Sequence, residues 1–286
     1  MSTFKTVRNV IRAQPASDGD GVQLMRVFGG GMHQPSLFDP FLMMDEFGSY
    51  EPQDYIGGFP SHPHRGFETM TYMLEGHMEH RDHMGNVGDL GPGDVQWMTA
   101  GAGVVHSEMP KQTEGRMRGF QIWLNLPAKT KMQPASYQDI AANEFSLTEM
   151  PGLSIKMISG VVTVDGNPVS GFVQRPDTEP DFADITVSDN EWHELALSST
   201  GKTALLYVYE GELSLSEGGR LLTPGELVLL NRDGDSVQIK ASPGSRIVFL
   251  AGQPLDEPVV QYGPFVMNSR EEIEQALRDV RSGQFP

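Results

Sequence analysis

The 286-residue chain contains no cysteine, which excludes disulfide bonds, thiolate metal ligands and sulfur nucleophiles. It has no apolar run approaching the roughly 20 residues that a helix needs to span a bilayer. The opening residues lack the apolar core of a signal peptide, so we expect the cytoplasm as the default compartment. The missing cysteine does not itself establish that compartment.

Basic residues are scarce and scattered. The chain has 21 Lys and Arg against 38 Asp and Glu, which gives a formal net charge of -17. Direct binding to nucleic acid requires clustered cations that neutralise phosphates, and anionic membranes attract basic surfaces. We therefore expect neither direct nucleic-acid binding nor membrane binding.

Glycine and proline, in contrast, are abundant. Thirty-two glycines and twenty prolines separate short apolar segments at intervals of about ten residues, a pattern typical of all-β proteins. Residues 21–30 alternate as a strand should, and residues 68–73, 95–98 and 119–126 are rich in strand formers. The sequence therefore predicts an all-β fold.

A single helix is predicted near the C-terminus. Ser269 and Glu272 form a capping-box pattern, and Gly283 supplies a stop signal. The apolar residues between them recur at helical spacing. They are Ile273, Ala276, Leu277 and Val280.

The chain contains an internal repeat. Residues 72–76, YMLEG, are followed by a Pro-Gly-Asp turn at 92–94, and residues 207–211, YVYEG, are followed by Pro-Gly-Glu at 224–226. Two similar β-barrels in tandem explain this repeat economically. We expect a metal-binding domain at residues 1–130 and a second barrel without metal ligands at 131–286. Residues 127–152 are interpreted as the connection.

Two short motifs in the first repeat predict a metal site. In a strand, residues i and i+2 point to the same side, so the pairs His62/His64 and His106/Glu108 each present two donors. Imidazole and carboxylate are natural ligands for divalent Fe, Mn, Ni, Cu or Zn. A sphere of three histidines and one carboxylate leaves positions open for water, O₂ or substrate.

The second repeat does not contain this set. Aligning the two Glu-Gly pairs places Leu197, Ser199 and Val237 opposite His62, His64 and His106, an overlay that ignores insertions. His193 is the single histidine in that half. The sequence therefore predicts one metal-binding barrel and one blank copy.

The remaining histidines are interpreted differently. His77, His80 and His83 flank a charged hairpin, where a solvated tip is favoured over a second metal site. His33 and His193 stand alone and are expected to be structural.

Other residues near the motifs have two interpretations each. Arg65 and Glu68 follow the first histidine pair and either orient the imidazoles or form a surface ion pair. The large apolar residues of these strands are expected in the core, and those facing inward near the metal would line a substrate pocket. They are Met70, Met73, Trp97, Met98, Phe120 and Trp123.

Four segments carry a specific resemblance. They are HPHRGFETMTYMLEG, GDVQWMTAGAGVVHSE, GFQIWLNLP and GPFVMNSREEIEQAL. Together they resemble the pirin family of the cupin superfamily. The resemblance implies a bicupin, two jelly-roll-like cupin barrels with a metal in the N-terminal one. The family's ligand positions fall on His62, His64, His106 and Glu108, all four present.

The resemblance implies two kinds of function. Bacterial pirin-like proteins are associated with quercetin 2,3-dioxygenase activity, and animal pirin with transcriptional coregulation through protein contacts. Our leading hypothesis is a metal-dependent dioxygenase that opens a flavonol-like ring with O₂. It would use one divalent metal, preferentially Fe(II), with Mn, Ni, Cu or Zn as alternatives. Glu108 is the predicted acceptor of the substrate's hydroxyl proton.

Two other classes remain open. The chain could be a non-enzymatic, metal- or redox-sensing module that binds a regulatory partner protein. A metal-dependent isomerase or decarboxylase fits the ligands but not the pirin-specific segments. Fold resemblance alone does not choose among these functions.

Overall fold

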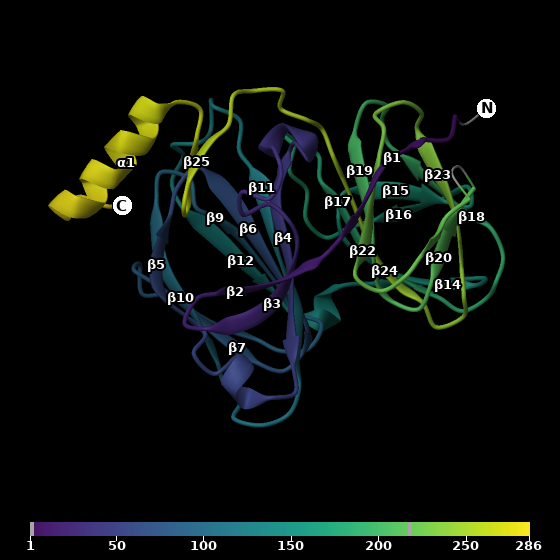
Figure 1. The fold of residues 1–286 in the computed structure, drawn as a ribbon, viewed down its shortest axis with the longest axis horizontal. Helices are drawn as coiled ribbons and strands as arrows, with labels where there is room; N and C mark the ends of the chain where they lie inside the picture. Colours follow the sequence, from purple (N-terminus) through teal and green to yellow (C-terminus); the bar gives the residue numbers. More distant parts are fainter. Residues whose placement is uncertain (1–2, 217–218) are drawn as a thin grey trace. The chain divides into compact units, whose positions relative to one another are not determined.

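The computed structural model describes residues 3–216 and 219–286, most of which lie in strands. They form two compact units, each built on a pair of antiparallel sheets, and one unit adds a two-stranded sheet of β25 (Val260–Tyr262) and β26 (Phe265–Met267) (Figure 1). One unit, here called the N-terminal barrel, comprises Gln14–Leu37, Phe41–Ala142 and Leu255–Pro286. The C-terminal barrel comprises Phe38–Pro40, Asn143–Pro254 and the described residues up to Ala13. The all-β prediction is therefore confirmed.

The N-terminal barrel has a seven-stranded sheet in the order β12-β9-β6-β11-β4-β3-β2 and a four-stranded sheet in the order β5-β10-β7-β8. The strands of the larger sheet are β2 (Gln14–Asp18), β3 (Val22–Phe28), β4 (Phe41–Ser49), β6 (Phe67–Glu75), β9 (Val95–Thr99), β11 (Met117–Asn125) and β12 (Ser136–Ile140). The smaller sheet contains β5 (Phe59–His64), β7 (Met78–Asp82), β8 (Val87–Leu90) and β10 (Val104–Pro110). The short 3-10 helices η1 (Pro35–Leu37) and η2 (Pro52–Asp54) lie in its connections.

The C-terminal barrel repeats this arrangement, with sheets in the orders β1-β22-β19-β24-β17-β14-β13 and β16-β15-β18-β23-β20-β21. The first sheet contains β1 (Val7–Arg12), β13 (Leu147–Met150), β14 (Leu153–Ser159), β17 (Asp181–Val187), β19 (Thr203–Glu210), β22 (Glu226–Leu230) and β24 (Arg246–Gly252). The second contains β15 (Val161–Val164), β16 (Asn167–Ser170), β18 (His193–Leu197), β20 (Leu213–Leu215), β21 (Leu221–Leu222) and β23 (Ser236–Ala241). The 3-10 helix η3 (Ala142–Glu144) precedes β13.

The units do not follow the contiguous division at residues 130 and 131. Strand β1 pairs with β22, so the start of the chain belongs to the C-terminal barrel. The final residues, 255–286, belong to the N-terminal barrel. Both assignments depend on pairing between segments distant in sequence, which a local pattern does not reveal.

Residues 127–152, expected as a connection, contain ordered and buried structure. Strand β12 extends the N-terminal barrel beside β9, and β13 pairs with β14. Lys131 is buried, and its Nζ donates to Gly66 O at 2.7 Å, Asn125 Oδ1 at 2.6 Å and Val266 O at 3.1 Å. This lysine therefore ties the C-terminal segment to the turn that follows β5.

The predicted helix is confirmed as α1 (Arg270–Ser282), which contacts β25 (Val260–Tyr262) and β26 (Phe265–Met267) (Figure 1). Ser269 and Glu272 form both hydrogen bonds of the capping box, and Gly283 ends the helix with a left-handed φ of 69°. No helix within residues 3–216 and 219–286 is long and apolar enough to cross a bilayer.

The interiors of the two barrels differ in polarity. The C-terminal barrel is filled by one continuous apolar cluster, which includes Ile155, Ile185, Leu206, Val228, Val237 and Phe249. The N-terminal barrel buries charged and polar side chains on its strands, including His64, His80, Gln96, His106 and Glu108. Thr71 on one sheet reaches Glu108 on the other, so polar side chains meet between these sheets.

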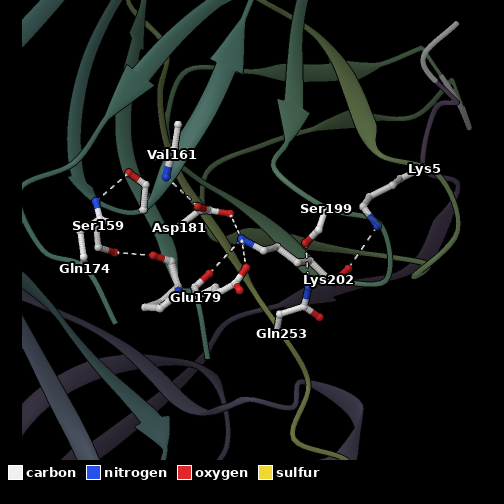
Figure 2. A network of polar contacts seen from close by, with 11 residues as sticks. Lys5, Ser159, Val161, Gln174, Glu179, Asp181, Ser199, Lys202 and Gln253 are labelled. Atoms are coloured by element: carbon white, nitrogen blue, oxygen red, sulfur yellow. Dashed lines mark hydrogen bonds and ion pairs between the residues drawn. The ribbon is translucent and has the colours of Figure 1, made fainter. Parts of the chain in front are cut away.

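Two buried lysines of the C-terminal barrel, Lys5 and Lys202, take part in a network of polar contacts (Figure 2). Lys202 Nζ lies 2.8 Å from Asp181 Oδ2 and donates to Glu179 O at 3.0 Å. Lys5 Nζ donates to Lys202 O at 3.1 Å. Burial raises the pKa of Asp181, opposed by Lys202, and burial lowers the pKa of Lys5. These contacts hold loops of the barrel together.

Candidate metal centre

Strands β5 and β10 bring the two predicted motifs together. They are antiparallel, with His62 opposite His106 and His64 opposite Val104. The alternation of β10 buries His106 and Glu108 and leaves Ser107 between them less buried. A register shift separates His106 and Glu108 in this pairing, because β5 contributes one extra residue there.

The three histidines converge on one point. One ligand nitrogen from each of His62, His64 and His106 lies within 4.8 Å of the others. The Nε2 atoms of His62 and His64 are 3.0 Å apart. Two metal–nitrogen bonds of about 2.1 Å meeting at a right angle separate their nitrogens by about 3.0 Å. The observed separation therefore suits two ligands of one metal ion.

The tautomer of His62 suits metal binding. Its Nδ1 lies 2.8 Å from Pro60 O, and a carbonyl oxygen can only accept. Nδ1 therefore carries the proton, and Nε2 presents its lone pair toward His64. A metal ligand needs such a free lone pair.

His106 leaves one nitrogen without a protein partner. Its Nδ1 lies 2.8 Å from His80 Nε2, whereas its Nε2 is buried and makes no hydrogen bond. A buried polar atom without a partner costs roughly 1–3 kcal/mol. Coordination by Nε2 would remove this cost, so the residues present fit a divalent metal.

Electrostatics keep the buried histidines neutral. Burial lowers the pKa of His64 well below its ordinary value, and repulsion between the protonated forms of His64 and His62 lowers it further. Burial likewise lowers the pKa of His106, with added contributions from His64, His62 and His80. Neutral imidazoles can bind a metal without first losing a proton.

Glu108 lies on the inward face of β10 but outside the close group of nitrogens. Its side chain is buried, and its Oε1 accepts a hydrogen bond of 3.2 Å from Thr71 Oγ1. Thr71 Oγ1 also lies 2.7 Å from the side-chain amide of Gln121. Because the hydroxyl has a single proton, its donation to Glu108 requires this amide to face Thr71 with Nε2, which then donates to Oγ1. The structure thus brings three of the four predicted ligands together, and the role of Glu108 as a ligand stays a prediction.

The interpretation of His80 as part of an exposed hairpin tip was wrong. His80 is fully buried on β7, whereas His77 and His83 are exposed. Strand alternation puts His80 on the same side as buried Met78. This alternation is the sequence signal that could have identified His80, because an apolar residue two positions earlier marks the inward face.

The interpretation of Arg65 and Glu68 as a surface ion pair was wrong, whereas a role of Glu68 in orienting the imidazoles stays a prediction. Arg65 is buried and forms an ion pair of 2.6 Å with Asp279 of α1, and its guanidinium lies over the ring of Phe285. Glu68 is also buried and accepts from Thr99 Oγ1 at 2.6 Å. The hydrogen bonds described for these two residues are not to the histidines, and neither residue is on the surface.

Apolar residues occupy the equivalent positions in the C-terminal barrel. The strand register identifies which residues of the two barrels occupy equivalent positions, without a sequence alignment. Leu195 pairs with Val237 on β18 and β23, just as His62 pairs with His106 on β5 and β10. This corrects the sequence overlay by two residues on the first strand, because the connection after β18 is longer than the one after β5. The equivalents of His62, His64, His80, His106 and Glu108 are Leu195, Leu197, Leu215, Val237 and Ile239.

The polar residues of the larger sheet are replaced in the same way. Register with neighbouring strands makes Thr71, Gln96 and Gln121 equivalent to Leu206, Val228 and Phe249. All three replacements lie in the apolar cluster that fills the C-terminal barrel. That interior is therefore packed, and its described residues provide no ligand set like the one in the N-terminal barrel.

His193 makes hydrogen bonds to two carboxylates. Its Nδ1 and Nε2 lie 2.7 Å from Asp165 Oδ2 and 3.0 Å from Asp189 Oδ1. Burial alone lowers the pKa of His193, but the two hydrogen bonds outweigh this effect and raise it. Its predicted structural role agrees with these contacts. Within the described residues, His33 and His193 lie outside the group of converging ligands.

Known proteins match the chain over nearly all its length. The pirin family profile matches residues 21–124, and that of the pirin C-terminal cupin domain matches residues 182–286. A "putative quercetin 2,3-dioxygenase" of Pseudomonas aeruginosa is 51% identical, over 99% of both chains. Human pirin is 37% identical, over 99% of this chain and 95% of its own.

A solved structure has the same fold. The crystal structure of a quercetin 2,3-dioxygenase from Acinetobacter baumannii is 32% identical, with a TM-score of 0.89 over 99% of both chains. Together with the second profile, this similarity confirms the two cupin barrels expected from the sequence.

Proposed function

This chain belongs to the pirin family, and on that basis we propose that it is a metal-dependent dioxygenase of the quercetin 2,3-dioxygenase type. Its substrates would be a flavonol or similar small aromatic and O₂. The observation that carries the proposal is the convergence of His62, His64 and His106, with a buried and unpartnered nitrogen on His106. The names of the bacterial relatives support the choice of reaction.

The metal would be held by His62, His64 and His106, with Glu108 as the fourth ligand, and Fe(II) is the proposed ion. A divalent metal bound there would supply Lewis-acid and redox chemistry for the reaction of a flavonol with O₂. Neutral, buried imidazoles suit that ion because they need not lose a proton before they coordinate it. Mn, Ni, Cu and Zn are also compatible with nitrogen and carboxylate donors.

Glu108 is the proposed acceptor of the proton from the flavonol 3-hydroxyl. Thr71 donates to its Oε1, which leaves Oε2 as the oxygen that would take the proton. A general base must lie within hydrogen-bond reach of the proton it removes. The hydrogen bond from Thr71 holds the Glu108 carboxylate in one orientation. The same contact would therefore determine from which side Oε2 accepts the substrate proton.

Aromatic rings beside the histidines would orient the substrate. The Trp123 ring lies 5.2 Å from that of His64 and 4.4 Å from that of Phe67, measured between centroids. Phe67 is fully buried, whereas Trp123 is only half-buried and keeps part of its surface accessible. Offset or edge-on contact with such a ring stabilises a planar aromatic ligand.

The test combines metal analysis with turnover. Purified protein would be analysed for metal and assayed for quercetin depletion with and without O₂, with Fe(II), Mn, Ni, Cu or Zn supplied separately. We expect O₂-dependent ring opening to a depside with release of carbon monoxide. Product formation that continues unchanged without O₂ would eliminate the mechanism.

Three variants link the activity to the site. His62→Ala should lose both metal and turnover, and Glu108→Gln should lose turnover. His77→Ala is the matched control, because this histidine is exposed and outside the ligand group. Equal turnover in all three would show that the activity arises elsewhere.

The second candidate is a metal-dependent module that binds a regulatory protein. This candidate is supported by the similarity to human pirin, which extends over 99% of this chain, because animal pirin is associated with regulation through protein contacts. It predicts that His62→Ala changes affinity for a partner while no phenol is turned over. The O₂ assay on wild-type protein separates the two candidates directly.

A further inference from the structure

The contact between His80 and His106 has no part in the chemistry proposed so far. Their side chains are 0% and 1% exposed, and His80 Nε2 lies 2.8 Å from His106 Nδ1. The two residues come from neighbouring strands, since β7 pairs with β10. Water has little access to this hydrogen bond, so each imidazole must satisfy the other.

One proton lies between these nitrogens, and it has two arrangements. Either His106 Nδ1–H donates to His80 Nε2, or His80 Nε2–H donates to His106 Nδ1. In both, one buried donor and one buried acceptor are left over, because His106 Nε2 and His80 Nδ1 make no hydrogen bond. The protein groups alone therefore do not favour one arrangement strongly.

Metal coordination would favour one of these two proton arrangements over the other. His106 Nδ1 is engaged with His80, so Nε2 is the nitrogen available to the cluster of His62, His64 and His106. A coordinating Nε2 must be free of its proton, which then resides on Nδ1. His80 Nε2 must in turn accept, and its own proton moves to Nδ1.

We propose that His80 is the positioning residue of the metal site, whose Nε2 accepts the Nδ1–H of His106 and so holds His106 in the metal-binding tautomer and orientation. This inference rests on the metal site of the proposed function but not on its substrate or reaction. Outer hydrogen-bond partners of ligating histidines commonly contribute roughly 10–100-fold to metal affinity.

The choice of a histidine here has a physical consequence. Such partners are usually carboxylates, backbone carbonyls or water. A neutral imidazole orients the ligand without adding negative charge to a buried site. The Tyr137 ring, with its centroid 5.7 Å from that of His80, packs beside it. In the C-terminal barrel the equivalent position is Leu215, which has no acceptor, and the position of His106 is Val237.

The test measures metal binding without turnover. Co(II) would be titrated into metal-free wild-type protein, His80→Leu, which removes the acceptor, and His80→Gln, which restores one. We expect His80→Leu to bind Co(II) roughly 10–100-fold more weakly. His80→Gln should bind close to the wild-type affinity, and exposed His77→Ala should match wild type. Thermal unfolding of each variant would verify that it is folded.

A spectroscopic measurement distinguishes positioning from packing. In ¹⁵N-histidine NMR spectra of the protein loaded with Zn(II), wild type and His80→Gln should show His106 with its proton on Nδ1. Unchanged Co(II) affinity in folded His80→Leu would overturn the inference. So would an equal loss in His80→Gln, which would indicate a role in packing only. Normal metal binding without O₂-dependent turnover would instead overturn the dioxygenase and leave this inference standing.

Discussion

Arg65, which directly follows His64, forms a partly buried ion pair of 2.6 Å with Asp279 on α1. The same guanidinium lies over the Phe285 ring, 4.6 Å from its centroid, and its Nε donates to Ala102 O. The last residues of the chain are therefore attached to the strand that carries two of the three converging histidines.

Removing one partner of this pair should destabilise the N-terminal barrel. Asp279→Ala leaves the buried Arg65 guanidinium short of an acceptor, which should lower the free energy of unfolding by about 1–3 kcal/mol. Urea unfolding of the metal-free protein measures this loss. Glu274→Ala is the control on the same helix, since its pair with Arg278 is 3.8 Å long and exposed. An equal effect of both variants would contradict a specific role for the pair of Arg65 and Asp279.

The turn after β5 should tolerate only glycine at residue 66. Gly66 has a φ of 90°, and a Cβ there would lie 2.0 Å from Val266 O. Gly66→Ala should therefore destabilise the barrel by more than the roughly 1–2 kcal/mol of left-handed backbone strain alone. Gly85→Ala isolates that strain, because Gly85 has a similar φ of 87° and open space around it. Equal unfolding free energies for the two variants would show that the close approach to Val266 has no cost.

Stability of the C-terminal barrel should depend on pH through His193. Its pKa in the folded protein is raised above the ordinary value of 6.5 by Asp165 and Asp189, against the opposing effect of burial. The folded state then binds a proton that the unfolded state releases. The resulting stabilisation is complete below the unfolded pKa and is lost as the pH rises through the folded pKa.

NMR titration of His193 and urea unfolding across that pH range measure this effect. His193→Gln should remove it, because glutamine does not titrate. A difference in stability between wild type and variant that stays constant across the range would contradict the prediction.

The hydroxyl of Thr71 should matter for turnover more than for metal binding. Thr71→Val preserves shape but removes the hydrogen bond to Glu108 Oε1. A hydrogen bond to a charged group contributes roughly 1.5–3 kcal/mol, so turnover of quercetin should fall roughly tenfold or more. Co(II) affinity, determined chiefly by the three histidines, should change little. A large loss of Co(II) affinity with unaltered turnover per bound metal would contradict this prediction. It would show that Thr71 contributes to metal binding and not to turnover.

Local patterns in the sequence predicted much of this protein. The spacing of His62/His64 and His106/Glu108 predicted inward-facing pairs because strand side chains alternate. The capping box of Ser269 predicted the start of α1, since its hydrogen bonds join residues three apart. The repeat of YMLEG and YVYEG indicated two similar barrels, and the strand orders agree with it.

Only the tertiary structure decided which partners these segments find. His80 belongs beside His106 because β7 pairs with β10, and Arg65 belongs with Asp279, 214 residues away in the chain. The start of the chain joins the C-terminal barrel, while residues 255–286 join the N-terminal one. Alternation determines which face of a strand a side chain occupies. It does not determine which distant strand or helix lies against that face, because that choice depends on burial and hydrogen bonding across the whole fold.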